Sequence, residues 1–305
     1  EFSSPTLNKE LNENLSNIKK SIILPLGEVK LTRKIKSLSI IFRTNTNIEI
    51  WDQNKKRIFE KPKIEYALRC LNSLIKSIKK VKEKKPNILI KLQVIDDNSN
   101  DENLKKIKDL INSDGIDCKI INHNKSEHKE KIAAENNDET FGNLSSLLKC
   151  FEIAKKEHSD LIYFVEDDYL HYDHSLVDML DTYERISSQH KDEIIVCPSD
   201  YPFNYMTNEK TNILIGSRQH WRIITKMLCT FMISKKTFQK HIDNFEKTCE
   251  KRHDPFEKYL NEILQKEIAI SPVMSLAIHL TNVNSSYGLS PFVDYKKLWD
   301  KNKVN

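Results

Sequence analysis

The sequence predicts an α/β protein with a mostly parallel central sheet flanked by helices. Short apolar runs typical of buried strands recur along the chain. Between them lie segments whose apolar residues repeat at the 3.6-residue period of a helix. Strands that alternate with helices in this way form βαβ units, and such units place their strands parallel.

The first predicted strand covers 38–42, and Pro62 is placed to open the first helix, because proline suits the first helical turn. Apolar residues keep helical spacing from Ile64 to Val81. The later predicted elements are strands at 88–95, 118–121, 161–165, 194–197 and 227–233, and helices at 101–111, 143–154, 175–186 and from Pro255, with loops at 122–139 and up to 222 and an irregular C-terminal tail.

Composition excludes several classes of function. The chain has 305 residues and a net charge of only +5, so we expect no nucleic-acid partner. Its five glycines are too scattered for the glycine-rich loops of Rossmann or P-loop proteins. A phosphate-bearing ligand would therefore need another source of positive charge.

Residues 1–36 are polar and lysine-rich and predict an N-terminal arm, followed by one domain over 37–305. No apolar run is long enough to span a bilayer, so we expect a cytoplasmic or peripheral membrane protein. Glu1-Phe2 is interpreted as a cloning remnant, which leaves open a natural anchor ahead of it. The lysines of 79–85 predict a solvated helix face; the alternative is attraction to an anionic membrane.

Two acidic clusters follow predicted strands. Asp96 and Asp97 end the second strand, and Glu166-Asp167-Asp168 ends the fourth. In open α/β sheets, ligands bind at the carboxyl ends of strands. In the alternative explanation of the first cluster, Asn98-Ser99-Asn100 forms a turn and Asp101 caps the helix that follows. The three adjacent carboxylates of the second cluster exceed what one cap requires. Their repulsion favours a bound Mg²⁺ or Mn²⁺ whose coordination is completed by substrate phosphates.

These two clusters, together with Phe42-Arg43 at the end of the first strand, resemble the GT-A glycosyltransferases, especially glycosyltransferase family 2, over about 38–280. The resemblance implies a GT-A fold, a donor half over 37–170 and an acceptor half over 171–305. It also implies that Asp97 contacts the nucleobase or ribose of a nucleotide-diphosphate sugar, and that Asp168 holds Mn²⁺ or Mg²⁺ on the diphosphate.

The metal motif reads Glu-Asp-Asp rather than the Asp-x-Asp of family 2. This form is similar to that of N-acetylglucosaminyltransferase I-type enzymes. By that likeness Asp167 faces the ribose and Glu166 lies near the sugar, with Phe42 and Arg43 also on the donor.

The resemblance implies further roles in the second half of the chain. Asp254 precedes a predicted helix and is either its cap or the general base that deprotonates an acceptor hydroxyl, with Glu257 as the second candidate. His279 lies in an apolar stretch and is either a metal ligand or a core residue. Arg222 is a candidate for the diphosphate, and Trp221 either stacks on an acceptor sugar or packs in the core.

Together these features predict a metal-dependent glycosyltransferase that acts by direct displacement with inversion. The expected acceptor is a hydroxyl of a carbohydrate, a lipid-linked molecule or a protein. One alternative is a sugar nucleotidyltransferase, which the lack of glycine at 42–47 disfavours. The other is a catalytically inactive relative that binds a glycan or a protein.

Overall fold

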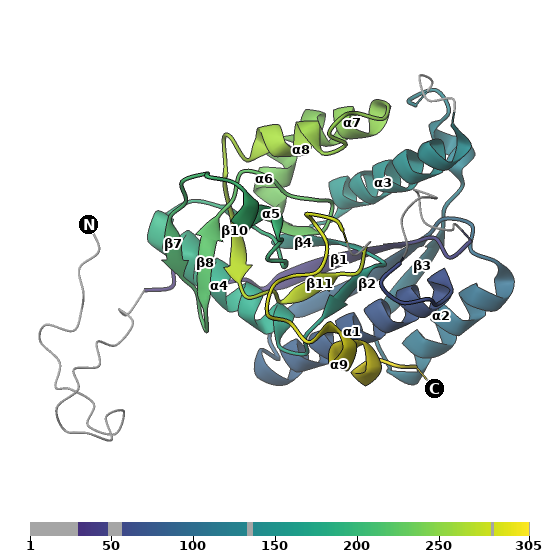
Figure 1. Ribbon diagram of the computed structural model, residues 1–305, viewed down its shortest axis with the longest axis horizontal. Coiled ribbons are helices and arrows are strands. Elements are labelled where there is room, and N and C mark those ends of the chain that lie inside the picture. The colour runs from purple at the N-terminus through teal and green to yellow at the C-terminus, as the bar shows by residue number, and fades with distance from the viewer. Residues whose placement is uncertain (1–29, 48–56, 133–136, 282–283, 305) are drawn as a thin grey trace, which may run out of the picture.

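The computed structural model describes residues 30–47, 57–132, 137–281 and 284–304. They form a mixed α/β structure around a nine-stranded sheet in the order β3-β2-β1-β4-β9-β6-β10-β8-β7 (Figure 1). Only β9 and β8 run against the other strands of this sheet, so the predicted α/β class with a mostly parallel sheet is confirmed. The strands are β1 (Ser37–Thr44), β2 (Leu89–Asp96), β3 (Cys118–Asn122), β4 (Leu161–Glu166), β6 (Ile194–Val196), β7 (Ile213–Ile215), β8 (His220–Ile223), β9 (Phe231–Ser234) and β10 (Ile268–Val273).

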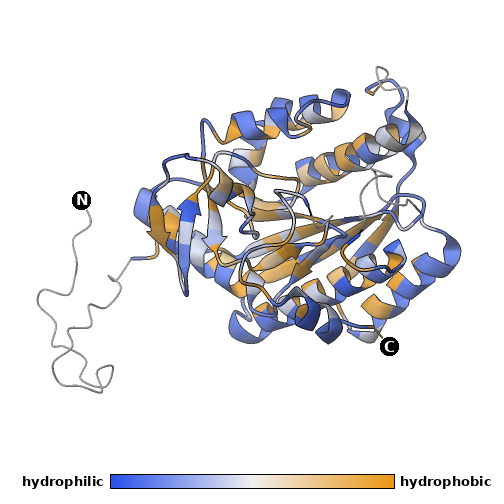
Figure 2. Ribbon diagram, viewed as in Figure 1, coloured by the Kyte–Doolittle hydropathy of each residue, from blue (hydrophilic) through white to orange (hydrophobic). Residues whose placement is uncertain are grey.

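Helices cover both faces of the sheet. On one face, α1, α2 and α4 bury apolar side chains in a shared core, and on the other α3, α6, α7 and α8 do the same (Figure 1). Apolar residues accordingly concentrate in the strands and on the helix sides that face them (Figure 2). The helices are α1 (Lys63–Lys84), α2 (Asp101–Ser113), the 3₁₀ turn η2 (Lys125–His128), α3 (Asp138–Lys156), α4 (Ser175–His190), α5 (Phe203–Met206), α6 (Lys235–Lys240), α7 (Ile242–Glu250), α8 (Lys258–Ile263) and α9 (Tyr295–Lys301).

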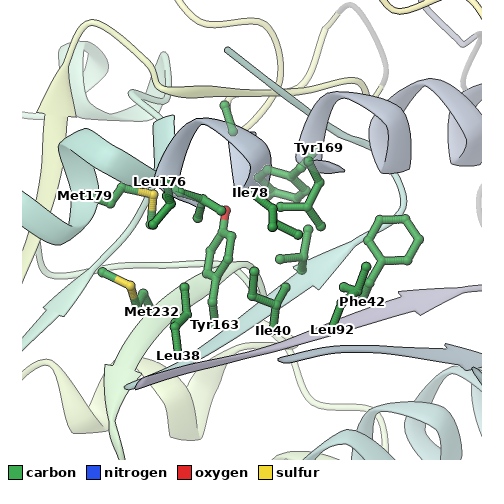
Figure 3. Packing of buried hydrophobic residues seen from close by; sticks show 14 of the residues in the cluster. Leu38, Ile40, Phe42, Ile78, Leu92, Tyr163, Tyr169, Leu176, Met179 and Met232 are labelled. Carbon is green, nitrogen blue, oxygen red and sulfur yellow. The ribbon is translucent and has the colours of Figure 1, made fainter. Parts of the chain in front are cut away.

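The first strand explains why the sheet needs helices on both sides. Its alternate residues Leu38, Ile40 and Phe42 pack into the core beneath α1 and α4 (Figure 3), whereas Ile41 packs into the opposite core. A strand buried on both faces is apolar throughout, as this run is. Because β1 pairs in parallel with both β2 and β4, the carboxyl ends of these three strands meet at one edge.

A second, two-stranded antiparallel sheet joins the end of β4 to the C-terminal part of the chain. Its strands are β5 (Tyr169–His171) and β11 (Ala277–His279), with His279 opposite Tyr169. An apolar cluster that includes Leu170 and Ile278 holds this small sheet against α1 and α9. Residue 279 is thereby brought beside residue 168, more than a hundred positions earlier in the chain.

The structure corrects the prediction for the second half. The expected loop up to 222 contains α5, β7 and β8, and the expected irregular tail contains β10, β11 and α9. The helix expected from Pro255 begins at Lys258 instead. Most of these elements have three to seven residues, which is too short for a clear hydrophobic period.

Most of the predicted N-terminal arm, residues 1–29, lies outside the described residues. Within 30–36, the backbone N–H groups of Thr32 and Arg33 donate to the hydroxyl of Ser188 at the end of α4. None of the helices in the described part of the chain is long and apolar enough to cross a lipid bilayer.

Candidate active site

A cavity of about 320 Å³ lies at the carboxyl ends of β1, β2 and β4. This volume is within the range of small-molecule sites, roughly 300–1,000 Å³. The β11 end and the turn before α8 close its other side. The lining residues are Arg43, Thr44, Asn45, Arg57, Lys63, Tyr66, Asp97, Asn143, Ser146, Glu166, Asp167, Asp168, Leu228, Cys229, Phe256, Glu257, His279, Leu280 and Thr281.

Arg43 and Glu166 lie opposite each other at the ends of β1 and β4 and form an ion pair of 2.5 Å. The Arg43 guanidinium also donates to the carbonyl of Asn143 and to the hydroxyl of Ser146 on α3. Burial raises the pKa of Glu166, and the Arg43 charge opposes that rise. With acceptors from two elements, Arg43 fixes α3 and β4 to one another.

Asp167 is fully engaged by hydrogen-bond donors. One of its oxygens accepts from the Thr44 hydroxyl (2.9 Å) and the Asn45 N–H (3.2 Å). The other oxygen accepts from the Lys63 ammonium at 2.5 Å. Sequence reasoning missed Lys63, and nothing in the sequence beside it marks this lysine as a cavity residue.

Asp168 faces His279, with Oδ2 3.3 Å from Nε2. The Nδ1 of His279 donates to the carbonyl of Tyr287 at 2.7 Å, which fixes the proton of a neutral imidazole on Nδ1. A neutral His279 would then turn the Nε2 lone pair toward a carboxylate oxygen, an arrangement that needs a cation or a proton between the two. The other oxygen of Asp168 is buried and has no hydrogen-bond partner among the described residues.

The Asp168–His279 pair fits a divalent cation. Burial would raise the pKa of Asp168, but the nearby His279 holds it well below its usual range; burial would lower the pKa of His279, but Asp168 raises it overall. No three His, Cys, Asp or Glu side chains of the described residues gather as a metal site. A carboxylate and an imidazole suit Mg²⁺ or Mn²⁺ when substrate phosphates supply the remaining ligands.

Asp97 lies at the end of β2 and is almost fully buried. Its oxygens accept from the side-chain amides of Asn45 and Asn98, each at 3.2 Å. Burial raises the pKa of Asp97. The helix cap predicted at Asp101 is Asn100 instead, whose side chain accepts from the Asn103 N–H, and Asp101 is the first residue of α2. Asp97 is therefore left facing the cavity with neutral partners.

The two candidate bases are placed differently. Glu257 lines the cavity just before α8, and burial raises its pKa to about 7. Asp254 is exposed and does not line the cavity. The difference follows from the late start of α8, because the turn at 255–257 carries Glu257 inward and leaves Asp254 at the surface.

Phe42 and Trp221 are corrected by the structure, because neither is open to a ligand. Phe42 is fully buried in the core beneath α1 (Figure 3), where alternation along β1 points it away from the cavity. Trp221 is fully buried in β8 rather than in a loop. Its indole packs so closely on Gly216 that a Cβ there would lie 2.2 Å from Nε1. The packing alternative for Trp221 is the one that the structure supports.

Arg222 is also outside the cavity lining. Arg222 is buried in β8. Its guanidinium lies 3.5 Å from the Asp200 carboxylate and 4.3 Å from the ring centre of Tyr205. These contacts direct the charge of Arg222 to α5 and its surroundings. The predicted contact of Arg222 with a diphosphate is therefore not supported.

The chain matches no protein-family model, and no curated protein is similar to it in sequence. Among solved structures it is similar to S. aureus TarS, with 14% identity and a TM-score of 0.43 over 78% of this chain and 58% of that chain. The glycosyltransferase GlyE of Streptococcus pneumoniae is 11% identical, with a TM-score of 0.44 over 89% of this chain and 61% of that chain. A cytidylyltransferase from Leptospira borgpetersenii is 13% identical, with a TM-score of 0.41 over 89% of each chain. The chain thus spans less than two thirds of the TarS and GlyE structures that it matches.

Proposed function

We propose that the protein is a glycosyltransferase that moves a sugar from a nucleotide-diphosphate donor to an acceptor hydroxyl. The observation that carries this proposal is the composition of the cavity. A carboxylate–imidazole pair suited to a divalent cation, a lysine and a half-buried glutamate with a pKa near 7 line the same cavity. The resemblance of the strand-end motifs to GT-A enzymes agrees with this reading.

In this proposal the donor lies along the carboxyl ends of β1, β2 and β4. Asp97 accepts hydrogen bonds from the base or ribose, because its present partners are neutral amides that leave acceptor capacity. Asp168 and His279 hold Mg²⁺ or Mn²⁺, which when bound would attract the donor diphosphate and offset part of its charge. Asp167 positions the loop after β1 through Thr44 and Asn45.

Glu257 is the general base of the proposed reaction. A base is most effective when its pKa is close to the working pH, and burial brings Glu257 into that range. The acceptor oxygen forms a bond to the anomeric carbon and its proton passes to Glu257. The bond from that carbon to the diphosphate breaks and its electron pair leaves with the nucleoside diphosphate. This direct displacement inverts the anomeric configuration.

A donor panel tests the proposal. The protein is mixed with UDP-, GDP- and CDP-sugars, with and without Mn²⁺, and its thermal unfolding is followed. A ligand at a hundredfold excess over its Kd stabilises the native state by about 2.7 kcal/mol. We expect metal-dependent stabilisation by the sugars of one base, followed by slow release of nucleoside diphosphate when water or a simple glycoside serves as acceptor.

Two other outcomes would contradict the proposal. Release of pyrophosphate from a nucleoside triphosphate and a sugar phosphate would identify a sugar nucleotidyltransferase. No stabilisation by any nucleotide, with or without metal, would point to a protein that binds a glycan or another protein without catalysis.

A further inference from the structure

Lys63 is a cation of the cavity wall that the proposed mechanism has not yet used. It is the first residue of α1, and its side chain is 20% exposed at the cavity. The first turn of α1 borders the cavity through Lys63 and Tyr66. The partial positive charge of a helix N-terminus adds to that of the ammonium, so this point of the cavity favours an anion.

Lys63 and Arg43 differ in how far their donors are committed. The Arg43 guanidinium donates to Asn143, Ser146 and Glu166, which leaves little for a ligand. An ammonium has three N–H donors. Among the described residues, Asp167 is the acceptor recorded for Lys63, so further donors of this side chain are available to a bound group.

Asp167 stays hydrogen-bonded if Lys63 turns to a ligand. Its second oxygen keeps the hydroxyl of Thr44, the last residue of β1, and the backbone N–H of Asn45, the residue after it. Lys63 also need not leave Asp167 to bind an anion, because one of its three N–H donors suffices for that carboxylate. A diphosphate is an anion with enough charge to attract the remaining donors.

The charge of the cavity makes a phosphate-binding cation necessary. Carboxylates outnumber permanent cations along its wall, so the protein side chains alone would repel a diphosphate. The charged lining residues are Asp97, Glu166, Asp167, Asp168 and Glu257 against Arg43, Arg57 and Lys63. One divalent cation at Asp168 and His279 brings this lining only to balance, and the diphosphate then adds further negative charge.

We propose that Lys63 binds the diphosphate of the donor and stabilises the departing nucleoside diphosphate. This inference rests on the proposed function and adds a residue to it. As the bond between the anomeric carbon and the diphosphate oxygen breaks, the electron pair stays on that oxygen, and Lys63 donates hydrogen bonds to the diphosphate as its charge grows. Charge-assisted hydrogen bonds of this kind are about twice as strong as neutral ones.

The test compares Kd values of the full chain for a nucleoside and for its diphosphate, at fixed Mn²⁺, using the base selected by the donor panel. Lys63→Met should weaken binding of the diphosphate about tenfold or more and change nucleoside binding less than twofold. The matched control is Lys82→Met, an exposed lysine at the other end of the same helix, which should bind both ligands like the wild type.

A double variant separates direct binding from a purely structural role. If Lys63 only neutralises Asp167, then Lys63→Met/Asp167→Asn should regain the affinity for the diphosphate. We expect that it does not, because the phosphate contact is still missing. The double variant also removes the unpaired buried carboxylate of Asp167, which would destabilise the Lys63→Met single variant.

The failures are distinguishable. A wild-type protein that binds no nucleoside diphosphate overturns the proposed function and this inference with it. A wild type that binds the diphosphate, with Lys63→Met binding equally well or losing nucleoside and diphosphate alike, overturns only the role of Lys63.

Discussion

The two sides of the cavity are formed by secondary-structure elements of different length. On one side, Arg43, Asp97 and Glu166 lie at or next to the ends of strands of six to eight residues that pair in continuous parallel register. On the other, His279 ends a three-residue strand, and Glu257 lies in a turn before a six-residue helix. The first side is fixed by the sheet, whereas the second is fixed by local contacts.

The contacts of the second side are few and identifiable. The Leu280 N–H donates to the carbonyl of Asp168 at 2.8 Å, and Nδ1 of His279 donates to the carbonyl of Tyr287. Side chains on short elements held in this way can shift when a ligand arrives, at less cost than those on a long ladder. In the proposed function the fixed side binds the donor, and the second side supplies a metal ligand and the base.

The largest effect is expected where the two sides meet. Asp168→Asn removes the carboxylate that faces His279, so we expect release of nucleoside diphosphate to fall about a thousandfold or more, with the metal-dependent thermal shift also lost. The fold should survive, because the side chains have the same shape. Asp109→Asn, on an exposed position of α2, is the matched control. Activity retained in Asp168→Asn would remove this residue from the reaction.

Glu257 tests the second side alone. Glu257→Gln should lower kcat about a hundredfold and leave the donor Kd unchanged, because general base catalysis contributes roughly a hundredfold to ten-thousandfold. The base must be ionised to accept a proton, so wild-type kcat should rise with pH up to about 7 and then level off. The variant should lack this rise.

Asp254→Asn is the comparison for Glu257→Gln. Because Asp254 is exposed and outside the cavity lining, Asp254→Asn should lower kcat much less than Glu257→Gln does. The reverse order of effects would show that the turn at 255–257 rearranges in the working enzyme and brings Asp254 inward.

A smaller effect, on binding only, is expected on the fixed side. Asp97→Asn places an NH₂ group against the amides of Asn45 or Asn98, where the carboxylate accepted from both. We expect a donor Kd about tenfold weaker and kcat changed less than threefold, measured by saturation with the sugar nucleotide. Asp101→Asn, exposed at the start of α2, is the control. A fall in kcat with an unchanged Kd would move Asp97 from binding to chemistry.

The same contrast explains what the sequence could predict. The first half could be predicted because its strands are continuous apolar runs and because strand ends mark the ligand edge, which located Asp97 and Asp168 at the cavity. Trp221 and Arg222 could not be placed, since β8 has only four residues and its neighbour β10 lies much later in the chain. Lys63 was missed because charge alone does not distinguish a cavity lysine from the solvated ones around it.

The smallest effect concerns stability in the second half, away from the cavity. Asp178 on α4 is 1% exposed, with one oxygen lacking a hydrogen-bond partner in the described structure, and burial raises its pKa to about 6. The folded protein keeps the Asp178 carboxyl protonated at pH values where the unfolded chain, with the ordinary pKa of 3.8, has already lost the proton. The free energy of unfolding is therefore unaffected by this group below about pH 4 and declines as the pH rises through about 6. The shift of about two units corresponds to about 3 kcal/mol at neutral pH.

Asp178→Asn removes this ionisation, so the free energy of unfolding should rise by about 1–2 kcal/mol at pH 8 and change little at pH 4, as measured by urea denaturation. The gain is smaller than the full shift because the amide brings two N–H donors of its own. Transfer activity should stay at the wild-type level, because Asp178 is outside the cavity lining. Equal stabilisation at both pH values would show that the ionised carboxylate is not the cause. Lower activity in the stabilised variant would show that Asp178 influences the cavity from outside its lining.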